Sequence, residues 1–108
     1  MAGSITPIDL KALLDGSSPF ALLDVREAGE YNSTHIPGAS WLPRRRLEFQ
    51  MRDSVPFKGV LVVVCDDDGR RAALAATTLE RIGYENVSIL QGGTNAWGLV
   101  RQLVPTDA

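Results

Sequence analysis

The feature that most constrains the fold is an uninterrupted apolar run, VLVVV at residues 60–64, that leads directly into the single cysteine, Cys65. A strand with one face in water alternates apolar and polar residues, and this run does not. It is typical of a strand covered on both faces at the centre of a parallel sheet. With 108 residues the chain has room for one domain, 1–108, and a domain of this size buries roughly two-thirds of its unfolded surface.

Helical and strand-like segments alternate along the rest of the chain. Thr6 and Pro7 form a helix-start signal and Gly16 a stop signal. Helical spacing of apolar residues predicts a second helix over about 71–82. We also predict strands at 20–25, 39–42 and 87–90, and helices near 27–32, within 44–52 and after the glycine pair at 92–93. This alternation predicts a three-layer α/β domain with a parallel-rich sheet and right-handed crossovers.

Composition and charge argue against several classes of protein. The chain has 11 basic and 13 acidic residues, so its charge of −2 offers no attraction for nucleic acid or anionic membranes. One cysteine and one histidine cannot form a disulfide or supply a zinc site. We therefore expect no nucleic-acid partner, no membrane partner and no metal. The N-terminal sequence has no secretion-signal pattern, which predicts a cytoplasmic protein. Oligomeric state, and whether the chain is a piece of a longer protein, stay open.

Cys65 lies beyond the carboxyl end of the predicted central strand, where α/β sheets hold their ligands. The helix that follows begins a few residues later, so the intervening backbone can turn its N–H groups towards the sulfur. A helix N-terminus carries about half a positive charge and favours a thiolate or a bound anion. This context favours a nucleophilic thiol over an inert buried cysteine, although an ordinary strand-to-helix turn stays open.

Short motifs along the chain, in this order, resemble those of a single rhodanese domain. They are Asp24-Val25-Arg26-Glu27, Glu30-Tyr31, His35-Ile36-Pro37-Gly38-Ala39, Cys65 with Arg70 five residues on, Gly83-Tyr84, and Leu90-Gln91-Gly92-Gly93 with Ala96-Trp97. The resemblance covers nearly the whole chain. It implies a five-stranded parallel sheet flanked by helices, and a sulfurtransferase whose cysteine cycles through a persulfide. The basic and acidic stretches are also similar to rhodanese modules repeated in tandem in bacterial multidomain sulfurtransferases.

The resemblance implies a role for each matching residue. Cys65 is the nucleophile, and Arg70 matches the loop arginine of the family. The loop whose amides would surround the outer sulfur consists of Asp66, Asp67, Asp68, Gly69, Arg70 and Arg71. Asp24 and Arg26 are expected to be structural and to tie a strand end to neighbouring loops. His35 either touches substrate or is a loop histidine that hydrogen-bonds to backbone.

The loop departs from the family pattern in its charge. Asp68 stands at a common glycine position and Arg71 at a common serine position. Three aspartates and an ionised Cys65 against two arginines leave a formal charge of −2. Charges about 4 Å apart in water interact by about 1 kcal/mol, and a helix dipole contributes about 0.3–1 kcal/mol. We therefore predict a weakly acidified thiol that uses the thiosulfate dianion poorly and a persulfide, on a small thiol or on a protein, more readily. Aspartates pointing to solvent would weaken this effect through screening over about 8 Å.

A second charged feature is the basic stretch Arg44-Arg45-Arg46. As a functional element this stretch, with Arg44 as an auxiliary site residue, could lie near the mouth of the pocket and recruit an anionic donor or an acidic partner surface. The alternative is a solvated helix face.

Three functions remain under comparison. The leading one is a sulfurtransferase that takes sulfane sulfur from thiosulfate or a persulfide and passes it to cyanide or a thiol, a reaction that requires no cofactor. The second is a cysteine phosphatase or arsenate reductase. It is disfavoured because the loop from Cys65 to Arg70 is one residue shorter than in rhodanese-like phosphatases and its carboxylates repel phosphate. The third is a weakly active or non-catalytic rhodanese module that binds or regulates a protein.

Overall fold

The centre of the molecule is a five-stranded, fully parallel sheet, as the resemblance implied. The structure, a computed structural model, describes residues 2–103, with side chains described through residue 98. Residues 1 and 104–108 of the expected domain, and the side chain of Val100, lie outside the described part. The strand order is β1-β5-β4-β2-β3. The strands are β1 (Gly3–Ile5), β2 (Phe20–Asp24), β3 (Ser40–Trp41), β4 (Leu61–Cys65) and β5 (Val87–Leu90).

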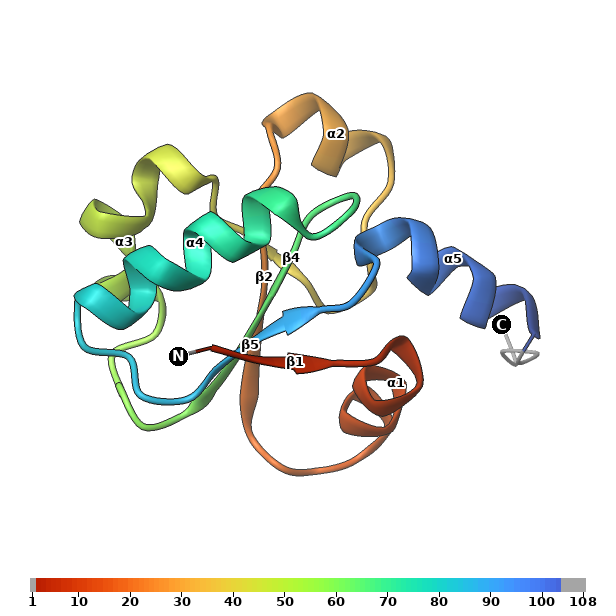
Figure 1. Ribbon diagram of the computed structural model, residues 1–108, viewed down its shortest axis with the longest axis horizontal. Coiled ribbons are helices and arrows are strands. Elements are labelled where there is room, and N and C mark those ends of the chain that lie inside the picture. Colours follow the sequence, from red (N-terminus) through yellow and green to blue (C-terminus); the bar gives the residue numbers. More distant parts are fainter. Residues whose placement is uncertain (1, 104–108) are drawn as a thin grey trace.

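Helices cover both faces of this sheet (Figure 1). The helical elements are α1 (Pro7–Asp15), α2 (Ala28–Ser33), the 3-10 turn η1 (Arg44–Arg46), α3 (Leu47–Ser54), α4 (Arg70–Arg81) and α5 (Gly93–Leu103). Two core clusters result. One joins the sheet to α3 and α4 through Leu47, Met51 and Leu79, and the other joins it to α1 and α5 through Leu10 and Trp97. The predicted three-layer α/β architecture is confirmed.

The central strand β4 supplies both clusters, as its unbroken apolar sequence predicted. Val62 and Val64 belong to the cluster with α3 and α4, while Val63 and Cys65 belong to the cluster with α1 and α5. All four are fully buried. The strand is therefore covered on both faces and ends with the cysteine side chain directed into the α1 and α5 layer.

Most predicted segments are present with shifted ends. The strand expected at 39–42 shortens to β3, and the basic segment 44–52 divides into η1 followed by α3. Thr6 caps α1 by accepting a hydrogen bond from the Asp9 amide at 3.1 Å. Within the described residues, no helix is both long and apolar enough to cross a membrane.

The edge strand β1 is the element that the sequence analysis missed. It has only three residues, pairs with β5 alone, and places Ile5 opposite Leu90. Such a short and largely exposed segment carries neither an apolar run nor a clear alternation, so no pattern distinguished it from a loose terminus.

Candidate active site

Cys65 is the last residue of β4 and its side chain is fully buried. Its carbonyl oxygen accepts a hydrogen bond from the Val25 amide at 3.0 Å, which ties the end of β4 to the segment after β2. In the parallel register Cys65 lies opposite Asp24. The thiol thus lies beneath the loop at the carboxyl edge of the sheet, between two strand ends.

The surroundings of the thiol favour its protonated form. Burial raises the pKa of Cys65 well above its ordinary value, and the neighbouring carboxylates of Asp24 and Asp66 raise it further. The guanidinium of Arg26 acts in the opposite direction and lowers the pKa of the thiol. This agrees in direction with the predicted weak acidification.

Asp66, the residue after Cys65, is fully buried, and its carboxylate binds the start of α4. It accepts hydrogen bonds from the amides of Gly69, of Arg71 at 2.6 Å and of Ala72 at 3.0 Å. These are the N–H groups that a helix start leaves unpaired. The alternative that all three aspartates point to solvent is wrong for Asp66, because its carboxylate replaces water on the helix amides.

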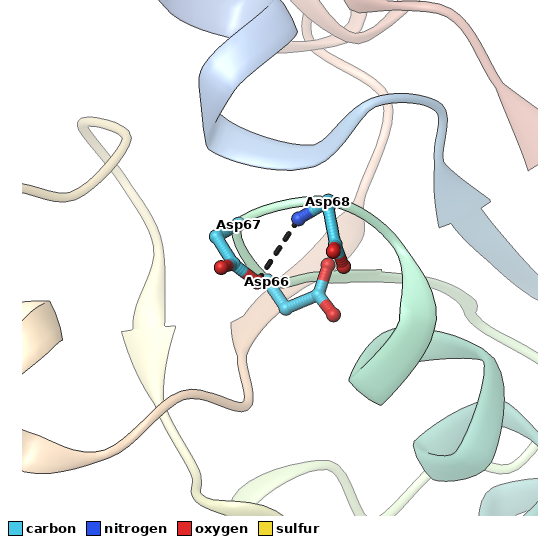
Figure 2. A group of neighbouring side chains, drawn as sticks. All are labelled: Asp66, Asp67 and Asp68. Atoms are coloured by element: carbon cyan, nitrogen blue, oxygen red, sulfur yellow. Dashed lines mark hydrogen bonds between the residues drawn. The ribbon is translucent and has the colours of Figure 1, made fainter.

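The other two aspartates of the loop also bind backbone amides. Asp67 accepts from the Asp68 amide at 3.0 Å, the bond drawn in Figure 2, and Asp68 accepts from the Arg70 amide at 3.0 Å. Together with Asp66 they take the amide hydrogens of residues 68–72. The amides expected to surround an outer sulfur atom thus bind the loop's own carboxylates in this conformation.

The three carboxylates can also be considered as a metal site, since oxygen atoms from Asp66, Asp67 and Asp68 lie within 4.8 Å of one another. Hard divalent cations prefer such ligands. Each carboxylate is, however, already a hydrogen-bond acceptor for backbone N–H groups of the loop. The cluster supports no metal proposal, and the expectation of no metal remains a prediction.

The two loop arginines behave differently. The side chain of Arg70 is 91% exposed, and its Nε lies 3.8 Å from Asp68. Arg71 instead reaches across to α2, where its guanidinium binds both carboxylate oxygens of Glu30 at 2.7 and 2.8 Å and Asp67 at 3.1 Å. The Arg71 guanidinium lowers the pKa of Glu30 to about 2. The motif match singled out Arg70, whereas the structure makes Arg71 the arginine that fastens the loop.

Asp24 and Arg26 form a buried pair at the end of β2. The Arg26 guanidinium donates to both carboxylate oxygens of Asp24, with the closest contact at 2.8 Å, and donates to the Thr34 carbonyl at 2.6 Å. The Trp41 indole N–H donates to the Arg26 carbonyl at 2.8 Å. The pair ties the strand end to the loops after α2 and β3, as the sequence analysis expected.

His35 is exposed and lies just after α2 (Ala28–Ser33), to which it is hydrogen-bonded. Its Nδ1 lies 2.8 Å from the Tyr31 carbonyl, and its ring stacks on Tyr31 at 3.9 Å between centroids. Of the two alternatives for His35, the structure supports the loop histidine that hydrogen-bonds to backbone.

The turn before α5 supports the loop from the other side, a contact that the sequence analysis did not identify. The Thr94 amide donates to the Asp66 carbonyl at 2.7 Å. A Cβ atom on Gly93 would lie 2.5 Å from the carbonyl oxygens of Asp66 and Asp67. Gly93, predicted only as part of a helix start, therefore allows the cysteine loop to approach.

A cleft of about 350 Å³ opens beside the loop, lined by Val25, Glu27, Arg44, Arg45 and Arg71. Arg45 forms an ion pair with Glu27. The third residue of the basic stretch, Arg46, lies over the Trp41 ring at 5.4 Å. Arg44 and Arg45 of the basic stretch therefore line this cleft, while the recruitment of an anionic donor or an acidic partner remains a prediction.

Comparisons with known proteins point to one family. The family described as "Rhodanese-like domain" matches residues 6–99. Centrosomal protein of 41 kDa from Rattus norvegicus is 40% identical over 82 residues, which cover 69% of this chain and 24% of that protein. Probable adenylyltransferase/sulfurtransferase MoeZ of Mycobacterium tuberculosis is 32% identical over 103 residues, which cover 94% of this chain and 26% of that protein. The chain thus spans about a quarter of the length of these relatives.

A solved structure agrees. Thiosulfate sulfurtransferase from Pseudomonas aeruginosa superposes with a TM-score of 0.86 at 35% identity, covering 91% of this chain and 19% of that chain.

Proposed function

The chain belongs to the rhodanese-like domain family, and we propose that it is a sulfurtransferase domain in which Cys65 carries the sulfane sulfur. The observation that carries the proposal is the position of Cys65, at the carboxyl end of the central strand and directly before the loop and helix α4. A relative named as a sulfurtransferase and a structural neighbour named as a thiosulfate sulfurtransferase support the same reaction class.

The first half-reaction transfers one sulfur atom from the donor. The Cys65 sulfur attacks the outer sulfur of a persulfide, R–S–SH, so that a new S–S bond forms and the old S–S bond breaks. The departing sulfur leaves as a thiol that takes the proton of Cys65, so the products are Cys65–S–SH and R–SH. With thiosulfate the Cys65 thiolate would release sulfite by the same displacement.

The second half-reaction restores the cysteine. Cyanide attacks the outer sulfur and leaves as thiocyanate, or a thiol takes the sulfur as a new persulfide. Both steps proceed through a covalent intermediate, so ping-pong kinetics are expected. No cofactor takes part in this scheme.

The burial of Cys65 and the charge of its loop favour a persulfide donor over thiosulfate. A doubly charged donor would bring its negative charge towards the carboxylates of Asp66 and Asp67, which lie in the cysteine loop. Like charges repel, so this donor is disfavoured. The donor is accordingly proposed to be a persulfide of a small thiol or of a protein. A single free cysteine suits a reducing, cytoplasmic setting.

A non-catalytic module is the second candidate, and two observations favour it. The thiol is fully buried with a raised pKa, and the centrosomal relatives carry names that describe no sulfur chemistry. A rhodanese domain without turnover would use the same fold to bind a protein.

Thiocyanate formation in the presence of cyanide distinguishes these functions. The protein is assayed with glutathione persulfide and with thiosulfate, and Cys65→Ser is the control. Sulfur transfer predicts parallel double-reciprocal lines, faster turnover with the persulfide, and none with the serine variant. Absence of turnover with both donors, together with a thiol that iodoacetamide labels only in urea, would support the binding module.

A further inference from the structure

The cleft beside the cysteine loop contains one unneutralised cation. The Glu27 carboxylate pairs with Arg45, and the Arg71 guanidinium pairs with Glu30 and Asp67. Arg44 makes no side-chain hydrogen bond or ion pair with any of the residues whose side chains the structure describes. Among the residues that line the cleft, Arg44 therefore offers the free charge.

The cleft borders the sulfur site through two of its walls. Val25, on one wall, donates its amide to the Cys65 carbonyl at 3.0 Å. Arg71, on another, donates its amide to Asp66 at 2.6 Å. A molecule in the cleft therefore lies beside residues that are bonded to the Cys65 backbone and to Asp66.

Charge differs sharply between the loop and the cleft. Close to the thiol lie the carboxylates of Asp24 and Asp66, which disfavour negative charge near the reacting sulfur. At the cleft the free guanidinium of Arg44 favours negative charge. A guanidinium binds a carboxylate through two parallel hydrogen bonds, which makes arginine well suited to this anion.

We propose that this cleft binds a carboxylate of a low-molecular-weight persulfide donor, and that Arg44 selects donors with a carboxylate remote from the sulfur. The inference rests on the proposed sulfur transfer and names its donor class. A cleft of about 350 Å³ lies at the lower end of the range for small-molecule sites, which suits a peptide-sized thiol. The preference separates such a donor from thiosulfate, which has its charge next to the sulfur.

The test compares two donors on three proteins. Glutathione persulfide retains both carboxylates of the peptide, and the persulfide of glutathione diethyl ester has neither. The proteins are the wild type, Arg44→Ala, and Arg46→Ala as a matched control that removes the same charge from η1 outside the cleft. The rate at which Cys65 gains one sulfur atom is followed by intact mass over a range of donor concentrations.

Arg44→Ala is expected to raise the half-saturating concentration of glutathione persulfide about fivefold, the upper range for an exposed ion pair, with little change in the limiting rate. For the diethyl ester, Arg44→Ala should change the half-saturating concentration by less than about twofold, because the ester has no carboxylate for Arg44 to bind. Arg46→Ala should resemble the wild type with both donors. Equal effects of the two substitutions, or equal use of donor and ester by the wild type, would overturn the proposal.

A binding measurement separates this inference from the proposed function. S-methylglutathione has the same carboxylates and cannot transfer sulfur. If its titration, followed by NMR, shifts the resonances of the cleft residues in the wild type, and about fivefold more ligand is needed for the same shifts in Arg44→Ala, the carboxylate site stands even if no persulfide forms. If the titration shifts neither protein, the site is refuted, whether or not Cys65 transfers sulfur.

Discussion

Two buried aspartates flank Cys65, and they are neutralised in different ways. Asp24, at the end of β2, and Asp66, directly after β4, both have no exposed surface. Asp24 meets a guanidinium, because Arg26 donates to both of its oxygens. Asp66 meets only backbone, because three amides at the start of α4 donate to it. The first carboxylate is balanced by a full charge and the second by the partial charges of a helix end.

The difference matters for the thiol between them. Arg26 lowers the pKa of Cys65, but the Asp24 carboxylate raises it by more, so the pair only partly offsets the negative charge that a thiolate would meet. Asp66 raises the pKa of Cys65 and occupies amides that could otherwise stabilise an anionic sulfur. Both carboxylates therefore disfavour a thiolate, and only the Asp24 side includes a cation that opposes this effect.

The largest effect is expected from breaking the charged pair. Arg26→Met leaves the Asp24 carboxylate buried without a cation, which should lower the free energy of unfolding by about 3–5 kcal/mol. Urea denaturation measures the loss. The double variant Asp24→Asn with Arg26→Met removes the uncompensated charge and should recover a large part of it. A single variant that loses less than about 1 kcal/mol would show that Asp24 is not held by its guanidinium.

Removing the Asp66 carboxylate should destabilise the protein less and should make the Cys65 thiol more reactive. Asp66→Ala leaves three amides without their acceptor and should lower the free energy of unfolding by about 2–3 kcal/mol. It also removes the weakest of the three influences that raise the pKa of Cys65, so the rate of alkylation by iodoacetamide at pH 8 should rise, though less than on removal of the Asp24 carboxylate.

Asp68→Ala is the control for this experiment, because Asp68 accepts a backbone hydrogen bond only from Arg70 and is exposed. It should cost less than about 1 kcal/mol and leave the alkylation rate nearly unchanged. An Asp66→Ala protein that stays folded with an unchanged alkylation rate would contradict the restraining role of Asp66.

The raised pKa of Cys65 predicts a loss of stability at alkaline pH. The unfolded thiol loses its proton near its ordinary pKa of 9.0, while the folded thiol keeps it. Above pH 9 the unfolded chain therefore binds fewer protons, and the free energy of unfolding falls by up to about 1.4 kcal/mol per pH unit. Cys65→Ala should remove this contribution. If the free energy of unfolding falls with pH at the same rate in the wild type and in the variant between about pH 9 and 10.5, the pKa of Cys65 is not raised in the folded protein.

The smallest effect on stability is expected from the ion pair between Glu30 and Arg71. Arg71 lowers the pKa of Glu30 to about 2, so the pair contributes stability above the ordinary pKa of 4.5 and loses it as the pH falls towards about 2. Because both side chains are partly exposed, Glu30→Gln should cost less than about 1 kcal/mol at pH 7. The difference in free energy of unfolding between the wild type and Glu30→Gln, measured by urea denaturation, should be smaller at pH 3 than at pH 7. If the difference is the same at both pH values, the ion pair does not cause it.

The elements that form the core were predictable from sequence, and those fixed by backbone contacts were not. β4 has an unbroken apolar run and α4 has apolar residues at helical spacing, so the burial of both followed from the sequence. β1 is three residues long at a sheet edge and is defined by its pairing with β5. Pairing partners distant in sequence leave no local pattern.

The site shows the same division. The position of Cys65 and the structural role of Arg26 followed from their motifs. The inward turn of Asp66 did not, because three adjacent aspartates look alike in sequence while only one is buried. A usable signal existed, since aspartate is a preferred acceptor for the free amides of a helix start and Asp66 lies shortly before α4. The choice of Arg71 over Arg70 depends on Glu30, 41 residues away, and needed the fold.

The most direct test of the account is intact-mass spectrometry after separate exposure to glutathione persulfide and to thiosulfate, with Cys65→Ser alongside. The account predicts a gain of one sulfur atom on the wild type, faster from the persulfide, discharged by cyanide and absent from the serine variant. No gain from either donor on the wild type, or the same gain on Cys65→Ser, would contradict the assignment of Cys65 as the sulfur carrier.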